Sequence, residues 1–518
     1  MHRRRFNNLL CRMGSRMSVE SSVAGLARDS DWSGLRVGVL GVGIAGFSCA
    51  DALMQLGASV YIIDSQNGEK QQERSGILGS LGAHVFLGVA ELPDQRLDLV
   101  ITSPGLEPHH IFHRQAFQRD IPVWGELELA WRLRSRLNAA QWLCITGTNG
   151  KTTTTLMLES MLRASGYRTV AAGNIGNSLV DVVMHDELDA IAIEVGAPQL
   201  PFVHSMSPFA SVCLNLAPDH VDHFAGFDAY AETKARIYTN TQCAAIYNDA
   251  DPRTIAMVEN ADVIEGARAI GFTLGIPGLS MLGVVDGAIV DRAFIPNRRD
   301  AAQELALVSD IHPSASHNTQ NALAAAGLAR AFGTSRVEPG ASDSVDVGGV
   351  TPSAIRTGLQ EFEPAGHRIA LVRELDGVAY VDDSKATNAH AAETSLMNYS
   401  SVIWIAGGLA KGQNFDELVR KTGDRIKAVI LMGTDGPLIE EALTRHASNV
   451  PIITLATRET SAMRQAVEIA HERAVPGDTV LLAPGCASWD MFTDYAHRGN
   501  SFSQAVASLE SAMPGGGN

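Results

Sequence analysis

The strongest constraint on this chain is the stretch from Trp142 to Thr154, which reads WLCITGTNGKTTT. An apolar run leads into a loop bracketed by two glycines, and the loop leads into Lys151 and a segment compatible with a helix. Small residues let backbone N–H groups close around phosphates, and the helix N-terminus adds partial positive charge. The stretch therefore predicts a strand, a phosphate-binding loop and a helix in succession, as in α/β nucleotide-binding domains.

The side chains of this loop suit a nucleoside triphosphate. Lys151 can reach the outer phosphates, and the hydroxyl of Thr152 can ligate Mg²⁺. The strict P-loop spacing requires a glycine where this chain has Ile145, so the loop is a variant. A glycine turn with an exposed lysine is the alternative, which the order of strand, glycines, lysine and hydroxyls disfavours. The candidate ATP-binding residues here are Gly147, Thr148, Asn149, Gly150, Lys151, Thr152 and Thr153.

Length and composition narrow the class of protein. A chain of 518 residues is too long for one core, and three domains are expected. With 45% hydrophobic and 19% charged residues it is typical of soluble globular proteins, and no apolar run is long enough to span a bilayer. The net charge of −16 argues against non-specific binding to nucleic acids or anionic membranes. Six scattered cysteines without a CxxC pair favour buried, reduced thiols and a cytoplasmic location.

The N-terminal segment is expected to lie outside the folded part. Residues 1–16 contain five arginines and no acid, but no continuous apolar core follows, so a secretory signal is not indicated. We expect residues 1–32 to form a disordered extension, with translation starting at Met1 or at Met17.

A second glycine loop follows a strand-like run at residues 35–41. Gly41, Gly43 and Gly46 have the spacing of the dinucleotide fingerprint, and the next strand, residues 59–64, ends on Asp64. The pattern predicts a diphosphate on a helix N-terminus, with Asp64 near a ribose or base. It does not specify NAD, and glycines that serve only helix–strand packing are the alternative.

Further strands are expected at residues 84–87 and 98–102. The second opens onto Ser103-Pro104-Gly105, at the end of a strand where open α/β sheets bind ligands.

Two more strands, residues 189–194 and 210–215, follow the phosphate loop. Their ends, Glu194 and Asn215, should meet Thr146 at one sheet edge, which makes Glu194 a candidate Mg²⁺ contact. The polar loop beyond Asn215 contains His220, and such a loop is often only solvated.

Two helices carry further polar candidates. Tyr230, Lys234 and Tyr238 recur with helical spacing, and Lys234 by composition alone is a surface lysine. Asn318 and Asn321 share a face at the start of an alanine-rich helix, where they can bind a base or ribose or cap the helix.

A third strand–helix alternation begins at Val378 and predicts another parallel α/β sheet, with strands at residues 378–381, 402–406, 428–432, 452–455 and 479–482. Two lysines and several hydroxyls at the strand ends suit a small dicarboxylate. The lysines and hydroxyls are those of Lys385, Thr387, Lys411 and Ser488, and Asp383 lies in the same loop as Lys385.

Taken together, these motifs resemble the Mur ligase family. GTNGKTT at residues 147–153 and HN..NA at residues 317–322 are shared across the family, including folylpolyglutamate synthases. DDSKATN at residues 382–388 and APGCAS at residues 483–488, with Arg498-Gly499, resemble the branch that adds D-glutamate. The resemblance extends from about Leu35 to Phe502.

The resemblance implies an ATP-dependent ligase. ATP would phosphorylate the carboxylate of UDP-N-acetylmuramoyl-L-alanine to an acyl phosphate, and the glutamate amine would displace phosphate to form an amide for peptidoglycan synthesis. By motif, the catalytic residues would be Lys151, Glu194, His220 and Lys234, with Lys234 carbamylated. Thr152, Glu194, His220 and Lys234 would surround Mg²⁺. Asn321, Arg368 and Asp383 would be on the ATP side, and Lys385, Thr387, Lys411, Ser488 and Tyr495 would bind D-glutamate. The UDP substrate would contact Gly43, Ile44, Ala45, Gly46, Asp64, Ser65, Ser103, Pro104, Gly105, Asn174 and Gln199.

Two segments depart from the family pattern. Gly196-Ala197-Pro198 stands where the family has Ser-Ser-Phe, which removes two hydroxyls and stiffens the loop. Ala370 stands where glutamate usually follows the His367-Arg368 pair.

The expected fold is α/β with three domains: a Rossmann-like UDP-binding domain (33–129), a P-loop-type ATP-binding domain (130–364) and a Rossmann-like amino-acid-binding domain (365–518). The expected cofactors are ATP and Mg²⁺, and the expected partners are small molecules, with a monomeric state. A family member with another amino-acid specificity, a nicotinamide oxidoreductase and a non-catalytic nucleotide-binding homologue are the alternatives.

Overall fold

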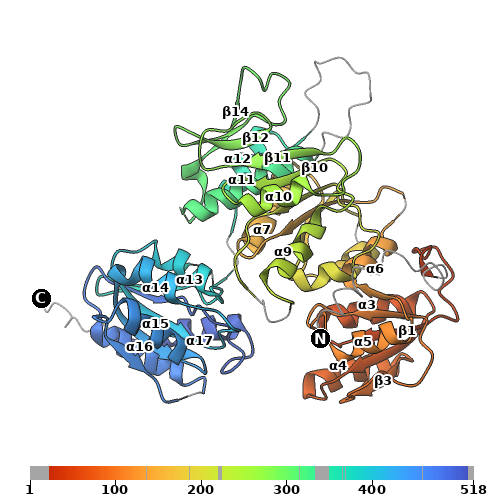
Figure 1. Cartoon of the computed structure of the whole chain (residues 1–518), viewed down its shortest axis with the longest axis horizontal. Helices are drawn as coiled ribbons and strands as arrows, with labels where there is room; N and C mark the ends of the chain where they lie inside the picture. Colours follow the sequence, from red (N-terminus) through yellow and green to blue (C-terminus); the bar gives the residue numbers. More distant parts are fainter. Residues whose placement is uncertain are drawn as a thin grey trace, which may run out of the picture. The chain divides into compact units, whose positions relative to one another are not determined.

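The computed structural model describes residues 23–510, except residues 136, 186, 220–223, 314, 333–348, 364–365, 368 and 458. Three separate sheets, each covered by helices, are arranged in sequence along the chain (Figure 1). They confirm the expected α/β class. The first two sheets belong to one compact unit, whereas the third belongs to a second unit that begins at Glu363 and also includes the segment from Ala217.

The first sheet has the order β3-β2-β1-β4-β5, and every pair of neighbouring strands is parallel. Its strands are β1 (Arg36–Leu40), β2 (Ser59–Asp64), β3 (His84–Leu87), β4 (Leu99–Thr102) and β5 (Val123–Gly125). Its helices are α3 (Ile44–Gln55), α4 (Glu69–Ser80), α5 (Ile111–Gln118) and α6 (Glu126–Leu133). Apolar runs without alternation are buried on both faces of such a sheet, which is why β1 and β4 were recognisable from the sequence.

The second sheet has nine strands in the order β14-β13-β12-β11-β10-β9-β6-β8-β7. It is parallel from β12 to β7, and β13 is antiparallel to both β12 and β14. The strands are β6 (Gln141–Thr146), β7 (Thr169–Gly173), β8 (Ala190–Glu194), β9 (Ala210–Cys213), β10 (Ala244–Asn248), β11 (Arg268–Phe272), β12 (Met281–Val285), β13 (Ala288–Asp291) and β14 (Gln303–Leu307). The helices are α7 (Lys151–Ala164), α8 (Leu179–His185), α9 (Phe227–Ala235), α10 (Pro252–Glu259), α11 (Ser316–Ala331) and α12 (Pro352–Gln360).

The third sheet has the order β15-β16-β20-β17-β18-β19, with only the β15–β16 pair antiparallel. The strands are β15 (Ala370–Leu375), β16 (Val378–Asp382), β17 (Val402–Gly407), β18 (Ile426–Met432), β19 (Ile452–Thr454) and β20 (Thr479–Leu482). The helices are α13 (Ala389–Leu396), α14 (Asp416–Thr422), α15 (Gly436–His446), α16 (Ala462–Arg473) and α17 (Tyr495–Ala507). All five strands expected here are present.

Two expectations about local structure were wrong. The extension expected to be disordered through residue 32 is packed from Val23 onward: Trp32 is fully buried, and its indole N–H donates to the Ala27 carbonyl. Arg28 donates to the carbonyls of Val183 and Met184, near the end of α8, which fixes this segment to the second sheet's helices. The helical pattern through Tyr238 also changes, because α9 ends at Ala235 and a 3₁₀ turn, η3 (Arg236–Tyr238), follows.

The cysteines agree with the expectation of buried, unpaired thiols. The five described cysteines are all free, and four of them are buried. Burial raises the pKa of the Cys213 thiol to about 11 and that of Cys486 to about 12. Thiols held neutral in this way are poor nucleophiles. Within the described residues no helix is both long and apolar enough to cross a membrane.

Helix α7, which starts at the phosphate loop, is held by an unusually close contact with α12. A Cβ at Gly358 of α12 would lie 2.5 Å from Met161 Cα and 2.6 Å from Met161 N on α7. Only glycine lets the two backbones approach this closely, so the position of α7 depends on Gly358.

Gly358→Ala is therefore expected to lower the free energy of unfolding by about 1–3 kcal/mol, because α7 and α12 must separate. Gly76→Ala on the exposed side of α4 is the matched control. No atom lies within 4 Å of its added Cβ, so it should raise stability by roughly 0.5–1 kcal/mol. Calorimetric unfolding of the full chain measures both, and an unchanged midpoint for Gly358→Ala would contradict the expectation.

Candidate active site

The phosphate loop lies at the carboxyl edge of the second sheet, between three neighbouring strands. β6 is flanked by β8 on one side and β9 on the other, so Thr146, Glu194 and Cys213 end side by side. The three strand ends therefore converge as expected, although β9 ends at Cys213, two residues before the expected Asn215. The loop turns through Gly147 (φ 153°) and Gly150 (φ 83°), backbone conformations that side chains other than glycine rarely adopt.

Lys151, the first residue of α7, folds its side chain back over the loop. Its Nζ donates to the carbonyls of Gly147 and Thr148, both at 2.9 Å. The ammonium therefore lies directly above the backbone that would surround a phosphate chain, and the helix N-terminus adds to the positive potential.

Asn215, two residues after the end of β9, holds the phosphate loop through two hydrogen bonds. Its Oδ1 accepts from Asn149 N at 2.9 Å, and its Nδ2 donates to Asn149 O at 3.1 Å. A side-chain amide that pairs with both backbone groups of one residue fixes that residue as a strand would. Both backbone groups of Asn149 in the loop are therefore held by one side chain.

Glu194 connects the phosphate loop with the next part of the site. Its Oε2 accepts from the Thr152 hydroxyl at 2.7 Å, and its Oε1 accepts from Asn174 Nδ2 at 3.1 Å. The Glu194 side chain is 3% exposed, so these bonds offset much of the cost of burying its charge.

Lys234 is buried, although the sequence around it alone indicates a surface lysine. It is 1% exposed, its Nζ donates to Gly147 O at 2.8 Å and to Thr146 Oγ1 at 3.3 Å, and it lies 5.0 Å from the centre of the Tyr230 ring. Burying an ammonium beside the phosphate loop is costly, which makes Lys234 a candidate functional residue.

Asn318 and Asn321 lie on the first turns of α11, as expected. Asn321 Oδ1 accepts from the Thr154 hydroxyl at 3.3 Å, and Asn321 Nδ2 donates to Asn318 Oδ1 at 3.3 Å. A Cβ at Gly150 would lie 2.3 Å from Asn321 Oδ1, so α11 contacts the loop itself.

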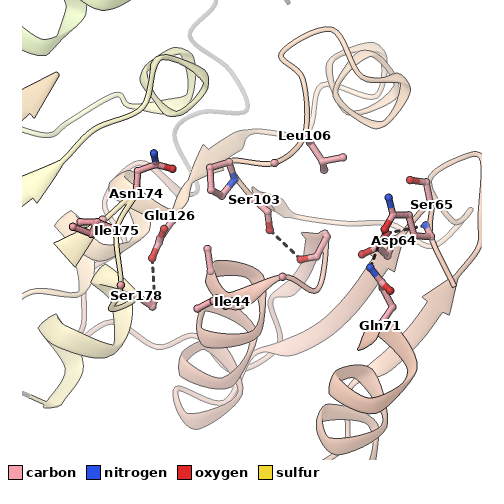
Figure 2. A pocket seen from close by; sticks show the side chains of 18 residues that line it. Ile44, Asp64, Ser65, Gln71, Ser103, Leu106, Glu126, Asn174, Ile175 and Ser178 are labelled. Carbon is pink, nitrogen blue, oxygen red and sulfur yellow. Dashed lines mark hydrogen bonds between the residues drawn. The ribbon is translucent and has the colours of Figure 1, made fainter. Parts of the chain in front are cut away.

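A cavity of about 430 Å³ lies next to this region, between the glycine loop after β1 and the loop after β7 (Figure 2). It brings together the expected residues Gly43, Ile44, Ala45, Asp64, Ser65, Ser103, Pro104, Gly105 and Asn174. Gly41, the first glycine of the fingerprint, also lines it. The lining residues that the sequence did not indicate are Gln66, Gln71, Leu106, Glu126, Gly173, Ile175, Gly176 and Ser178. Neither Gly46 nor Gln199 lines it.

Gly46 serves packing instead. A Cβ there would lie 1.8 Å from Gly41 O, so the third glycine of the fingerprint lets α3 approach the turn. The carboxylate of Asp64 also turns inward: Oδ2 accepts from Val42 N at 3.0 Å and Oδ1 from Gln66 N at 2.9 Å. The acid that the fingerprint assigns to a ribose or base thus holds the glycine loop in shape.

Glu126 is the most informative of the missed residues. It is 2% exposed and accepts from the Ser178 hydroxyl at 2.8 Å and from Leu179 N at 2.9 Å, which caps the start of α8 (Figure 2). Burial raises its pKa. The GELEL sequence around it reads only as an amphipathic helix, so its tertiary partner gave no sequence signal.

The loop that departs from the family pattern forms a 3₁₀ turn, η1 (Ala197–Phe202). Gln199 Oε1 accepts from Gly196 N at 2.8 Å, and within the described residues its Nε2 is buried without a hydrogen-bond partner. The turn therefore retains an amide donor although the two hydroxyls of the usual sequence are absent.

The third sheet carries its own group of polar residues at the strand ends. Lys385 Nζ lies 3.6 Å from the centre of the Tyr495 ring, and Lys411 Nζ lies 4.7 Å from that of Trp489. Ser488 is 3% exposed, and Asp383 accepts a hydrogen bond from Ser395. Thr387 follows Lys385 in the same loop, where its N–H donates to Lys385 O at 2.8 Å. His220 and Arg368 lie outside the described residues.

Arg498 ties this group together from α17. It is 1% exposed and donates to the hydroxyl and carbonyl of Ser384 and to the carbonyl of Cys486, at 2.8–3.1 Å. The loops that carry Lys385 and Ser488 are therefore anchored to one guanidinium.

The residues at the phosphate loop fit Mg²⁺. Magnesium prefers oxygen ligands, keeps several waters and binds through one or two protein groups plus phosphates. The Thr152 hydroxyl and the Glu194 carboxylate supply such oxygens 2.7 Å apart. No cluster of three or more His, Cys, Asp or Glu side chains suited to a metal occurs in the described residues.

Comparison with known proteins agrees with this geometry. Three family models match in succession: the Mur ligase MurD-like N-terminal domain over residues 35–125, the Mur ligase middle domain over residues 145–329 and the Mur ligase glutamate ligase domain over residues 367–486. The UDP-N-acetylmuramoylalanine--D-glutamate ligase of Streptomyces coelicolor is 50% identical over 484 residues, or 93% of this chain and 99% of that protein. The enzyme of the same name from Thermobifida fusca is 44% identical over 480 residues, or 92% and 99%.

Solved structures show the same fold at low identity. UDP-N-acetylmuramate-alanine ligase MurC of Thermotoga maritima is 15% identical with a TM-score of 0.53, covering 92% of this chain and 100% of that chain. A pseudomurein peptide ligase type C of Methanothermus fervidus gives 15% identity and 0.55 over the same shares. With all three domain models matched in order, and relatives up to half identical over almost its whole length, this chain belongs to the Mur ligase family.

Proposed function

We propose that the chain is an ATP-dependent ligase that joins D-glutamate to UDP-N-acetylmuramoyl-L-alanine through an acyl phosphate, a step of peptidoglycan precursor synthesis. Relatives at 43–50% identity over more than nine-tenths of the chain carry the name of this activity. The family assignment removes the support for a nicotinamide oxidoreductase, since the glycine fingerprint was its only basis.

One observation carries the proposal. Glu194 bonds Thr152 of the phosphate loop with one oxygen and Asn174, which lines the cavity, with the other. A ligase of this type must bring the γ-phosphate of ATP to the carboxylate of a second bound nucleotide. A phosphate loop and a nucleotide-sized cavity that share one buried carboxylate provide this adjacency.

Most of the residues around the phosphate loop would bind ATP or Mg²⁺. Lys151 and the loop N–H groups would bind the ATP phosphates and stabilise charge during transfer, because a positioned cation acts where negative charge develops. Thr152, Glu194, His220 and Lys234 would hold Mg²⁺, which supplies Lewis-acid stabilisation of the phosphates. Carbamylation would convert Lys234 from a buried cation into an oxygen ligand. Asn321, Arg368 and Asp383 would contact ATP.

The first sheet would hold the UDP part of the substrate in the cavity, and the third sheet would bind glutamate. Lys385 and Lys411 supply cations for two carboxylates, with Thr387, Ser488 and Tyr495 beside them. We further propose a monomeric protein that works in the cytoplasm.

The amino-acid specificity can be tested directly. With UDP-N-acetylmuramoyl-L-alanine, ATP and Mg²⁺, we expect phosphate release with D-glutamate and not with L-glutamate, L-lysine or diaminopimelate. Lysine would place an extra cation against Lys385 and Lys411. Release with one of these three amino acids and not with D-glutamate would move the protein to another specificity.

Lys151→Ala should lower kcat/KM for phosphate release by about 10²–10³-fold, because a preorganised cation is lost from the transferring phosphate. Lys70→Ala, on the exposed surface of α4, is the matched control and should be unchanged. Calorimetric binding of UDP-N-acetylmuramoyl-L-alanine should survive in both variants. A wild-type protein as inactive as Lys151→Ala would instead indicate a non-catalytic homologue.

Asn174→Ala should raise KM for the UDP substrate about tenfold, the cost of losing a hydrogen bond to a charged group. KM for D-glutamate should stay the same, since that site lies on the third sheet. Asn177→Ala, in the same loop but outside the cavity lining, is the control. An effect confined to KM for D-glutamate would contradict the assignment of the cavity.

A further inference from the structure

The third sheet contains a histidine–carboxylate pair that the roles above leave unused. His367 Nδ1 lies 2.6 Å from Asp382 Oδ2 at the end of β16. Asp382 is 1% exposed, and its other oxygen accepts from Ser384 N at 2.9 Å. A carboxylate only accepts, so the His367 Nδ1–H donates to it. This tautomer leaves Nε2 as the basic nitrogen of the ring.

The backbone around this pair is arranged for close contact. His367 has φ 65°, in the left-handed region that few side chains adopt. Across from it, a Cβ at Gly499 of α17 would lie 2.1 Å from His367 Nδ1 and 2.7 Å from Asp382 Oδ2. Residues in such backbone conformations are often functional. Here the conformation places the imidazole of His367 against the carboxylate of Asp382.

The pair lies among the residues proposed to bind glutamate. Lys385 N donates to His367 O at 3.1 Å, and the Tyr495 ring lies edge-on to the imidazole, 6.5 Å between centres. The side chain of His367 is 18% exposed, and no described residue makes a hydrogen bond to its Nε2. Asp382 on β16 and Tyr495 on α17 face the imidazole. Among the described residues, Lys385, which lies over the Tyr495 ring, and Arg498, which interacts electrostatically with Asp382, are the charged groups next to them.

The proposed reaction needs a base at this place. The amine of glutamate is mostly an ammonium at neutral pH and has no lone pair with which to attack. We propose that His367, oriented by Asp382, takes a proton from the glutamate ammonium. This inference rests on the proposed ligase function.

Two protons leave the glutamate nitrogen as the amide bond forms. One N–H bond of the ammonium breaks, and the proton goes to His367 Nε2. The freed lone pair forms the C–N bond at the acyl phosphate carbon, and the bond from that carbon to the phosphate oxygen breaks. The departing phosphate takes the second proton from nitrogen and leaves as hydrogen phosphate, while the imidazolium releases its proton to solvent.

The test uses the full chain with His367→Asn. Asparagine tolerates the left-handed backbone, so the loop is expected to be retained. Transfer to D-glutamate should fall by about 10²-fold or more at pH 7. Hydroxylamine, which needs no base at that pH, should still trap the acyl phosphate as a hydroxamate at the wild-type rate.

The dependence on pH separates a base from a structural residue. As pH rises, solution supplies free amine, so the deficit of His367→Asn should shrink by about tenfold per pH unit. His446→Asn is the matched control, because His446 forms a similar pair with Asp416 at 3.0 Å on the surface of the same unit. It should match the wild type throughout. Asp382→Asn should show the same pH signature with a smaller deficit.

Three outcomes would overturn the proposal: a deficit that stays constant with pH, loss of hydroxamate together with transfer, or a change confined to KM for D-glutamate. A wild-type rate for Asp382→Asn would overturn the orienting role of Asp382. If the wild type itself forms no hydroxamate that depends on the UDP substrate, the ligase function fails, which is distinguishable from failure of the base.

Discussion

The site depends above all on one buried carboxylate at the edge of a parallel sheet. Glu194 is 3% exposed, and a charge removed from water this completely is stable only where its oxygens find donors. Thr152 and Asn174 supply those donors, so satisfying the carboxylate fixes the phosphate loop relative to the wall of the neighbouring cavity. The hydrogen bonds of this one side chain therefore fix the phosphate loop and the cavity wall relative to each other.

Close backbone approach is the second constraint. Gly358 lets α12 touch α7, Gly150 lets α11 touch the phosphate loop, and Gly499 lets α17 touch the pair of His367 and Asp382. At each place a single Cβ would collide with backbone or with a polar group of the site. The geometry of these places therefore depends on positions that have no side chain as well as on the polar side chains around them.

Much of the fold was predictable because its strands are buried on both faces. Runs such as residues 98–102, 402–406 and 479–482 fall on the buried strands β4, β17 and β20, since continuous apolar segments bounded by turns have few other structures. The phosphate loop and the glycine loop were predictable for a related reason: their glycines mark places where only a bare backbone fits. Burial of Trp32 was missed because a single tryptophan in a polar stretch has no period.

The sequence alone determined the α/β class, the phosphate loop, the glycine fingerprint and, by resemblance, the family, because each is carried by local spacing. Only the tertiary structure decided what several single residues do. It turned Asp64 toward the backbone, assigned Gly46 to packing, buried Lys234 beneath the loop and placed Glu126 on the start of α8. These roles depend on partners far along the chain, such as Glu126 with Ser178 or Lys234 with Gly147, and no local pattern encodes such a partner.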